Sequence, residues 1–159
     1  MPETSLVITT VLTELVLNGG STRNLQGETT STGYAVGGQA EPLIFDAVDL
    51  IAGSGTDIDK IHTLIGEWIE RTPILTVDGT YIGAWLDTMS GKVWLDATRV
   101  WPNCTEAKRD ARSRKELAIY DLAKGEEIRI DTESDRKAAY LSGTVGIVSD
   151  ETACALPAF

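Results

Sequence analysis

The chain has 159 residues, and 24 acidic side chains against 14 basic ones give it a formal net charge of −10. An acidic surface repels phosphate, so this charge argues against direct binding of nucleic acid. With 42% hydrophobic residues, the composition is typical of a globular protein. The chain holds no run of 18 apolar residues and does not open on an export signal, so we expect a cytoplasmic protein without membrane contact.

The cysteines and the histidine argue against metal and catalytic sites. Cys104 and Cys154 are too few for a disulfide framework, so we expect two free thiols in a reducing compartment. Zinc sites usually take three or four ligands, mainly Cys and His, whereas His62 is the only histidine, and we expect no metal and no cofactor. A serine nucleophile needs a neighbouring base, and His62 falls within a helical pattern. The sequence therefore predicts a protein without catalytic activity.

The first half of the chain combines helical patterns with most of the excess acidic charge. Residues 1–80 hold 11 acidic and 3 basic side chains. Apolar residues at helical spacing predict a helix over 4–18, which Gly19-Gly20 ends, and a second helix over 56–72. The segments expected between these helices are a polar loop with a short edge strand at 21–33 and strands at 33–38 and 43–45.

From residue 74 the pattern changes to the alternation that is typical of strands. Residues 88–91 form a turn signal, so 81–87 and 92–100 should pair as a hairpin. Asn103 is the expected cap of a polar helix, with Glu106 three residues further on. The other expected elements are strands at 74–77 (before the turn Asp78-Gly79), 117–122, 127–131 and 144–148, a helix at 132–142 and a loose tail at 149–159.

These elements predict an α+β fold, with a mainly antiparallel sheet of hairpins and two or three packed helices. No linker accompanies the change in charge near residue 80. We therefore expect a single domain over 1–159, with a helical acidic lobe at 1–73, a lobe of hairpin, helix and strands at 74–148, and the tail.

The predicted hairpin carries the first candidate site. Pairing Asp87 with Lys92 sets Trp85 opposite Trp94, and strand alternation then gives the hairpin two faces. A Trp pair beside a carboxylate can clamp a base or ring, although the same face can simply pack beneath the helical lobe or against a second copy in a homodimer. The apolar face holds Ile82, Ala84, Leu86, Val93 and Leu95, and the candidate ligand face holds Tyr81, Trp85, Trp94 and Asp96 together with Thr98.

A run of basic residues on the helix after Asn103 is the second candidate. In an acidic chain it is the one positive patch, so Arg109 and Arg112 are candidates to bind a ligand phosphate or an acidic partner. Pairs such as Asp110 with Arg114, four residues apart, suit a solvated helix equally well. The run consists of Lys108, Arg109, Arg112, Arg114 and Lys115.

The acidic residues of the first half form the third candidate, a surface for a partner protein. Clustered carboxylates can imitate nucleic acid and occupy a basic site on another protein, whereas the plainer reading of the same charge is solubility. The residues that would supply this charge are Asp46, Asp49, Asp57, Asp59, Glu67 and Glu70.

Four short motifs from Tyr81 onward form a recognisable pattern: Tyr81–Asp87 (YIGAWLD), Gly91–Asp96 (GKVWLD), Leu117–Leu122 (LAIYDL) and Gly125–Ile128 (GEEI), with a weaker match at Gly33–Val36. With these motifs the chain resembles small uncharacterised proteins of actinobacterial phages and mobile elements. Trp94 stands where that pattern has Tyr. The resemblance brings no catalytic residues, and it implies a phage or prophage accessory protein that acts on the host.

These observations lead to one hypothesis and two alternatives. The leading hypothesis is a non-catalytic phage accessory protein in the host cytoplasm, which binds and modulates a host protein of defence or replication through its acidic surface. The first alternative is a binder or sponge for a nucleotide or another small ligand, which uses the aromatic hairpin face. The second is a virion-associated structural protein, which would assemble with itself or with particles.

Overall fold

The computed structural model describes residues 2–130 and has an α+β fold in which every strand pair named below is antiparallel. The chain divides into two compact units, which are described one at a time. The described part of the first unit comprises residues 2–30 and 37–99, and that of the second comprises 31–36 and 100–130. The α+β class and the antiparallel hairpins expected from the sequence are confirmed.

The first unit is built on a four-stranded antiparallel sheet. Its strands lie in the order β1 (Gly20–Arg23), β4 (Thr80–Asp87), β5 (Lys92–Trp101) and β3 (Leu43–Asp46). The β4–β5 hairpin has the expected register, with Asp87 opposite Lys92. The Asp87 carboxylate closes the turn by accepting hydrogen bonds from the Met89 N–H and the Ser90 hydroxyl. The turn signal at 88–91 therefore fixed the register correctly.

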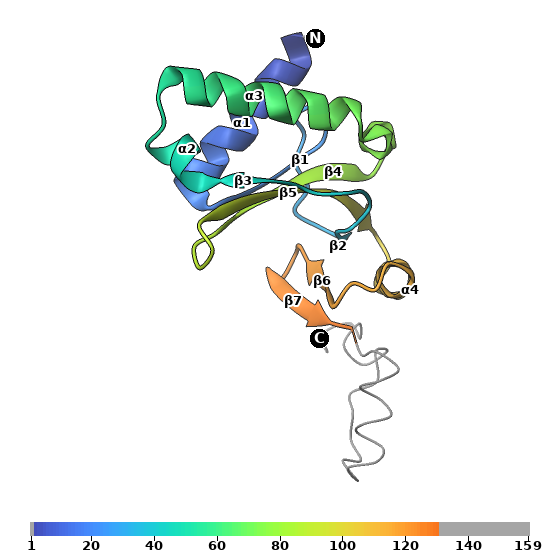
Figure 1. The fold of residues 1–159 in the computed structure, drawn as a ribbon. Coiled ribbons are helices and arrows are strands. Elements are labelled where there is room, and N and C mark those ends of the chain that lie inside the picture. Colours follow the sequence, from blue (N-terminus) through green and yellow to red (C-terminus); the bar gives the residue numbers. More distant parts are fainter. Residues whose placement is uncertain (1, 131–159) are drawn as a thin grey trace. The chain divides into compact units, whose positions relative to one another are not determined.

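Three helices cover one face of this sheet, as Figure 1 shows. They are α1 (Pro2–Asn18), α2 (Ala47–Ile51) and α3 (Gly55–Glu70). Ser54 and Asp57 cap α3 reciprocally through a capping box. The main buried side chains between helices and sheet are Val7, Val11, Leu12, Leu15, Ile61, Ile65, Trp68, Ile82, Val93 and Leu95.

The second unit contains a three-stranded antiparallel sheet and one helix. The strands lie in the order β2 (Tyr34–Val36), β6 (Ala118–Asp121) and β7 (Glu126–Arg129), and the helix is α4 (Cys104–Ser113). The Asn103 side chain caps α4 as expected, because it accepts hydrogen bonds from the first-turn N–H groups. The small core of this unit consists of Val36, Cys104, Ala107, Ala111, Ile119 and Ile130.

Three expectations about the elements need correction. Residues 74–77 do not form a strand, because Pro73–Thr76 is a 3₁₀ turn, η1, in which the Leu75 N–H donates to the Thr72 carbonyl. Helix α2 was not expected. The hairpin belongs to the same unit as α1–α3, so the boundary between the units does not fall at 73. The helix predicted at 132–142, the strand predicted at 144–148, the tail at 149–159 and the last residue of the strand predicted at 127–131 lie outside the described residues.

Two side chains of α4 also differ from expectation. Cys104 is disulfide-bonded, so the expectation of a free thiol is wrong at this position, and Cys154 lies outside the described residues. A disulfide depends on the distance between residues in space, which separation along the chain does not give. Lys108 is only 2% exposed, because Cys104, Ala107, Lys108 and Ala111 occupy the buried stripe of the helix.

Among the helices of residues 2–130, none has the length and apolar character needed to cross a membrane.

Candidate functional site

The aromatic face of the first unit is the side of its sheet opposite the helices, and it carries Tyr81, Trp85, Trp94 and Asp96 as expected. The cross-strand register continues beyond the hairpin, since Trp94 also lies opposite Ile44 of β3. Trp85, Trp94 and Ile44 thus form one apolar row across three strands, and Trp85 is 48% exposed. Exposed aromatic and aliphatic groups in one row make this face a candidate binding surface.

The two tryptophans do not form a clamp. Their rings stack on each other, with centroids 5.6 Å apart and planes inclined by 13°. A ring held between two others needs about 7 Å, because each stacked layer of carbon atoms adds roughly 3.5 Å. The expectation that a base or ring lies between Trp85 and Trp94 is therefore wrong, and a ligand could stack only on the outer surface of the pair.

Asp96 lies on the aromatic face in a partly buried, closely packed position. One carboxylate oxygen, Oδ2, accepts a hydrogen bond of 2.8 Å from the Gly38 N–H, whereas Oδ1 is buried without a partner. Burial raises the pKa of this carboxyl above its ordinary value. A Cβ atom at Gly37 would lie 2.5 Å from Oδ2, so this approach requires glycine. Asp96 is thus held in place by the Gly38 N–H and by the close approach of Gly37.

The basic candidates lie in the other unit. Arg109 and Arg112 are exposed on α4 of the second unit, whereas the aromatic face belongs to the first unit. Arg114 donates to Asp110 at 2.8 Å, which confirms the ion pair expected on a solvated helix face. Asp110 also accepts from the Trp101 indole N–H.

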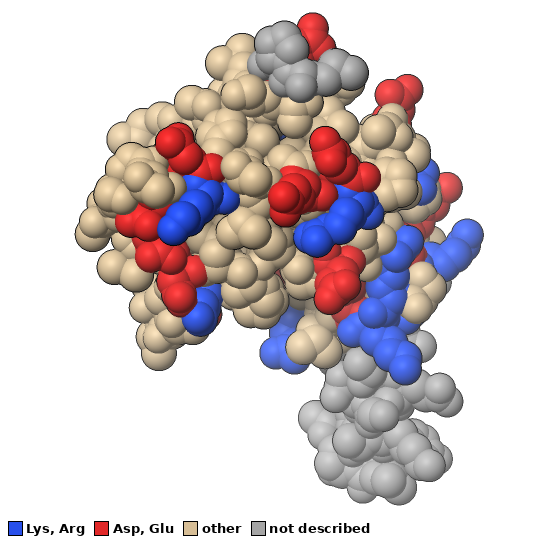
Figure 2. All heavy atoms as spheres, turned by 45° about the horizontal axis from the view of Figure 1, so that its top comes forward, with Lys and Arg blue, Asp and Glu red and all other residues tan. Residues whose placement is uncertain are grey.

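The six acidic candidates lie in the first unit, but not all of them are available to a partner. Asp46 pairs with Lys92 across the sheet. Asp57 serves the capping box, and the hydrogen bonds from Ser54 lower the pKa of its carboxyl. Figure 2 shows acidic side chains in small groups, several with a basic side chain beside them and uncharged surface between the groups. The exposed candidates without such a structural role are Asp49, Asp59, Glu67 and Glu70.

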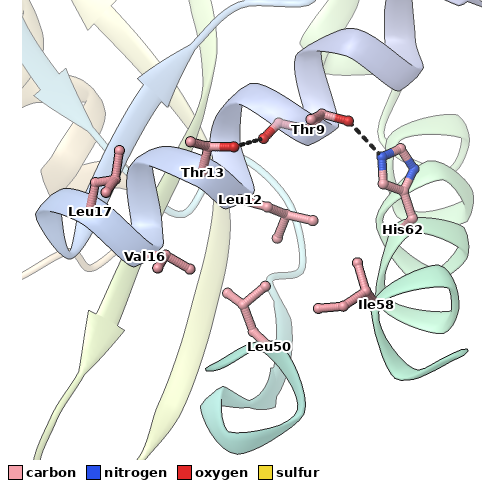
Figure 3. Close-up of a pocket in the computed structure, with 8 residues that line it drawn as sticks. All are labelled: Thr9, Leu12, Thr13, Val16, Leu17, Leu50, Ile58 and His62. Carbon is pink, nitrogen blue, oxygen red and sulfur yellow. Dashed lines mark hydrogen bonds between the residues drawn. The ribbon is translucent and has the colours of Figure 1, made fainter. Parts of the chain in front are cut away.

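A groove between α1, α2 and α3 is the feature that the sequence analysis missed. Its cavity has a volume of about 350 Å³. Figure 3 shows side chains of all three helices converging on it, with Leu12 of α1, Leu50 of α2 and Ile58 of α3 around the centre. The residues that line this helical groove are Thr9, Leu12, Thr13, Val16, Leu17, Leu50, Ile58 and His62.

The rim of the helical groove exposes apolar side chains to an unusual degree. Val16 is 54% exposed and Leu17 is 74% exposed, and both line the cavity. Leu6 of α1 and Val48 and Ile51 of α2 are exposed too, but they are not among the residues that line this cavity. Single exposed apolar residues are ordinary, whereas Val16 and Leu17 side by side at an apolar cavity mark a candidate binding surface.

The polar edge of the groove contains His62 and two threonines. The Thr9 hydroxyl donates to the Ser5 carbonyl at 3.0 Å, so its contact of 3.1 Å with His62 Nε2 requires that His62 donates. The Thr13 hydroxyl in turn donates to the Thr9 carbonyl at 2.8 Å (Figure 3). All these hydrogens are therefore used within the protein, and the edge presents hydrogen-bond acceptors to a bound group.

No family model, curated protein or solved structure matches this chain. Residues 2–130 also hold no group of three or more His, Cys, Asp or Glu side chains arranged to bind a metal ion. The two candidate binding surfaces are therefore the aromatic face and the helical groove of the first unit. A signal for the groove was present in the sequence, because Val16 and Leu17 extend the apolar run of α1 beyond the width of one helix face.

Proposed function

We propose that this chain is a non-catalytic accessory protein of phage or mobile-element origin, which binds a host protein through its helical layer, α1–α3. The observation that carries the proposal is the helical groove, an apolar cavity with exposed Val16 and Leu17 at its rim. The resemblance of residues 81–128 to phage proteins supports the origin. Apolar surface of this kind favours association, since each buried Å² contributes roughly 25 cal/mol.

The acidic charge supports the same surface. The three helices carry seven acidic side chains and one basic side chain, Lys60. Such a layer repels nucleic acid and other acidic molecules while it attracts basic proteins over a Debye length of about 10 Å. Figure 2 shows groups of charge with uncharged surface between them, which differs from the continuous charge of a nucleic acid. We therefore propose that the partner protein binds mainly through apolar contact with the groove, and that the acidic side chains of the helices add electrostatic attraction.

A capture experiment with matched variants tests the proposal. The immobilised wild-type chain, Leu17→Glu and Met89→Glu are incubated with lysate of an actinobacterial host at low and at high salt. Met89 lies in the hairpin turn and is 96% exposed, so its variant makes the same chemical change outside the groove. We expect one host protein to be enriched by the wild type and by Met89→Glu, and to be lost with Leu17→Glu.

The substitution to Glu separates apolar contact from charge. Leu17→Glu increases the negative charge of the layer, so a partner held by charge alone would bind at least as well as before. Equal capture by all three proteins, or no enriched protein at low salt, would contradict the proposal. Melting curves of the variants check that the exposed substitution leaves the fold intact.

A second candidate function is favoured by the exposure of Trp85. A nucleotide base or another flat ring can stack on the outer surface of the Trp85–Trp94 pair. Titration with nucleotides should then shift the tryptophan emission of the wild type, and Trp85→Leu should abolish the shift. Unchanged emission and melting temperature across a nucleotide panel would eliminate this function.

We propose the host cytoplasm as the compartment in which the chain acts. Cytoplasmic thiols are normally kept reduced, so the disulfide of Cys104 counts against this compartment and makes the proposal testable. Host cells that express the chain are fractionated and alkylated before lysis. Recovery of the chain outside the cytoplasm, with Cys104 protected from alkylation, would contradict this location.

A further inference from the structure

We propose that the occupant of the helical groove is a basic amphipathic α-helix of the partner protein. This inference rests on the proposed function, and it adds the chemistry of the partner. It follows from the shape of the groove, from the hydrogen bonds along its edge and from the charge of the three helices.

The shape of the groove suits a helix better than a small molecule. The α1 residues that line it, from Thr9 to Leu17, recur at helical spacing along one face of α1. This face is about 12 Å long, which matches the roughly 10 Å spanned by apolar anchors at positions i, i+3 or i+4, and i+7 of a docked helix. Val16 and Leu17 line the cavity and are 54% and 74% exposed, and a docked helix that extends past the cavity would cover more of them than a small ligand.

The hydrogen bonds along the edge of the groove favour a partner that donates. The hydroxyl hydrogens of Thr9 and Thr13 go to α1 carbonyls, and the His62 Nε2 hydrogen goes to Thr9. The oxygen lone pairs that remain accept hydrogen bonds. Lysine and arginine are donors without acceptors, whereas carboxylates are acceptors only. The edge therefore offers hydrogen-bond acceptors to a lysine or arginine side chain of the partner.

The charge of the layer points the same way. The exposed Asp49 of α2 and Asp59 of α3 lie one residue from Leu50 and Ile58, which line the groove. On α1, Glu14 forms a salt bridge with Arg23, so its charge is already compensated within the chain. The helices that line the apolar groove thus carry a formal excess of acidic side chains, which complements a helix with an apolar stripe and basic flanks.

The test uses three fluorescein-labelled peptides of about 18 residues, a length at which an isolated helix becomes viable. The first has a Leu stripe at helical spacing with Lys elsewhere, the second has the same stripe with Glu, and the third has the composition of the first in a scrambled order. Anisotropy titrations measure their affinities for the whole chain at two salt concentrations. We expect the patterned basic peptide to bind at least about tenfold more tightly than either of the others, and more weakly at higher salt.

Two sets of variants identify the site. Val16→Glu should weaken the basic peptide by about tenfold or more, although it adds negative charge, because it removes apolar contact. Replacing both Asp49 and Asp59 with Asn should weaken the same peptide and flatten its salt dependence. Met89→Glu should change neither. Val16 is mostly exposed, so a melting curve is expected to show a folded variant.

Equal binding of the acidic and basic patterned peptides would overturn the charge of the inferred partner, and equal binding of the scrambled peptide would overturn its helical form. Insensitivity to Val16→Glu would overturn the site. These results are distinguishable from failure of the proposed function. If host capture depends on Leu17 while no peptide binds, the inference fails and the proposed function stands, whereas capture that is indifferent to Leu17 overturns the proposed function itself.

Discussion

The aromatic face and the helical groove both expose apolar side chains in the first unit, but they are held together in different ways. On the aromatic face, main-chain hydrogen bonds set Trp85 opposite Trp94 and Trp94 opposite Ile44. The groove depends instead on how three helices pack, with side chains from residues 9–17, 50, 58 and 62. Trp85 is partly covered because its ring stacks on Trp94, whereas Leu17 is 74% exposed. A binding partner would therefore bury more apolar surface at Leu17 than at Trp85.

The largest expected effect is the loss of stability on truncating a buried residue of the groove. Leu12 of α1 is buried in the core of the first unit, so Leu12→Ala should lower the free energy of unfolding by about 2–5 kcal/mol. Leu17→Ala, on the exposed rim, should change it by no more than about 0.5 kcal/mol. Urea unfolding of both variants measures the difference. Equal losses would show that the rim is part of the core, and that the groove is not a free surface.

A smaller effect is expected where α1 is tied to the edge of the sheet. Glu14 accepts hydrogen bonds from Arg23 and Ser21 of β1, and the hydrogen bond from Arg23 is the main reason that its pKa is lowered. Glu14→Gln should cost about 1–2 kcal/mol at neutral pH. A lowered pKa stabilises the fold above the unfolded value and loses this effect as the pH falls through the folded value. The melting temperatures of wild type and variant should therefore converge in acid.

Asp96 should behave in the opposite way on the aromatic face. Burial raises its pKa, so its ionisation opposes folding, and this cost grows as the pH rises from the unfolded toward the folded pKa. Asp96→Asn keeps an oxygen for the Gly38 N–H and removes the charge. We expect a melting temperature a few degrees higher than that of the wild type at neutral pH, and no such gain in acid. A lower melting temperature at neutral pH would contradict this account of Asp96.

The smallest expected effect concerns the tryptophan pair. Trp85→Leu removes the stacking on Trp94 but keeps an apolar residue in the row, so the loss should be about 0.5–1 kcal/mol. Thermal unfolding gives the loss, and the near-ultraviolet circular dichroism should lose the signal of coupled tryptophans. A loss of several kcal/mol would instead place Trp85 in the core, and would remove the aromatic face from the candidate surfaces.

The sequence predicted what depends on local pattern. The turn at 88–91 and the alternation of the flanking strands gave the correct hairpin register, and Asn103 marked the start of α4. Two predictions were wrong for the same reason: the spacing of apolar residues along the chain does not show which groups pack against a residue. Lys108 falls on the buried stripe of α4 despite its charge, and residues 74–77 follow Pro73 into a 3₁₀ turn despite their strand-like composition.

The groove was missed in the sequence analysis for a related reason. The spacing of apolar residues predicts the helix at 4–18, but which of them are buried also depends on how far the neighbouring helices extend. Helix α2, which contributes Leu50, has only five residues and gives little periodic signal. Register within a sheet is set by adjacent residues, whereas a cavity between three helices is set by tertiary packing.

The central claim is that the helical groove, and not the aromatic face, receives the partner. A titration of the isotopically labelled chain with the patterned basic peptide, followed by NMR, observes both surfaces at once. We expect the methyl signals of Leu12, Leu50 and Ile58 to shift, while the indole N–H signals of Trp85 and Trp94 stay in place. Shifts of the two indole signals with unmoved methyl groups would contradict the claim and assign binding to the aromatic face.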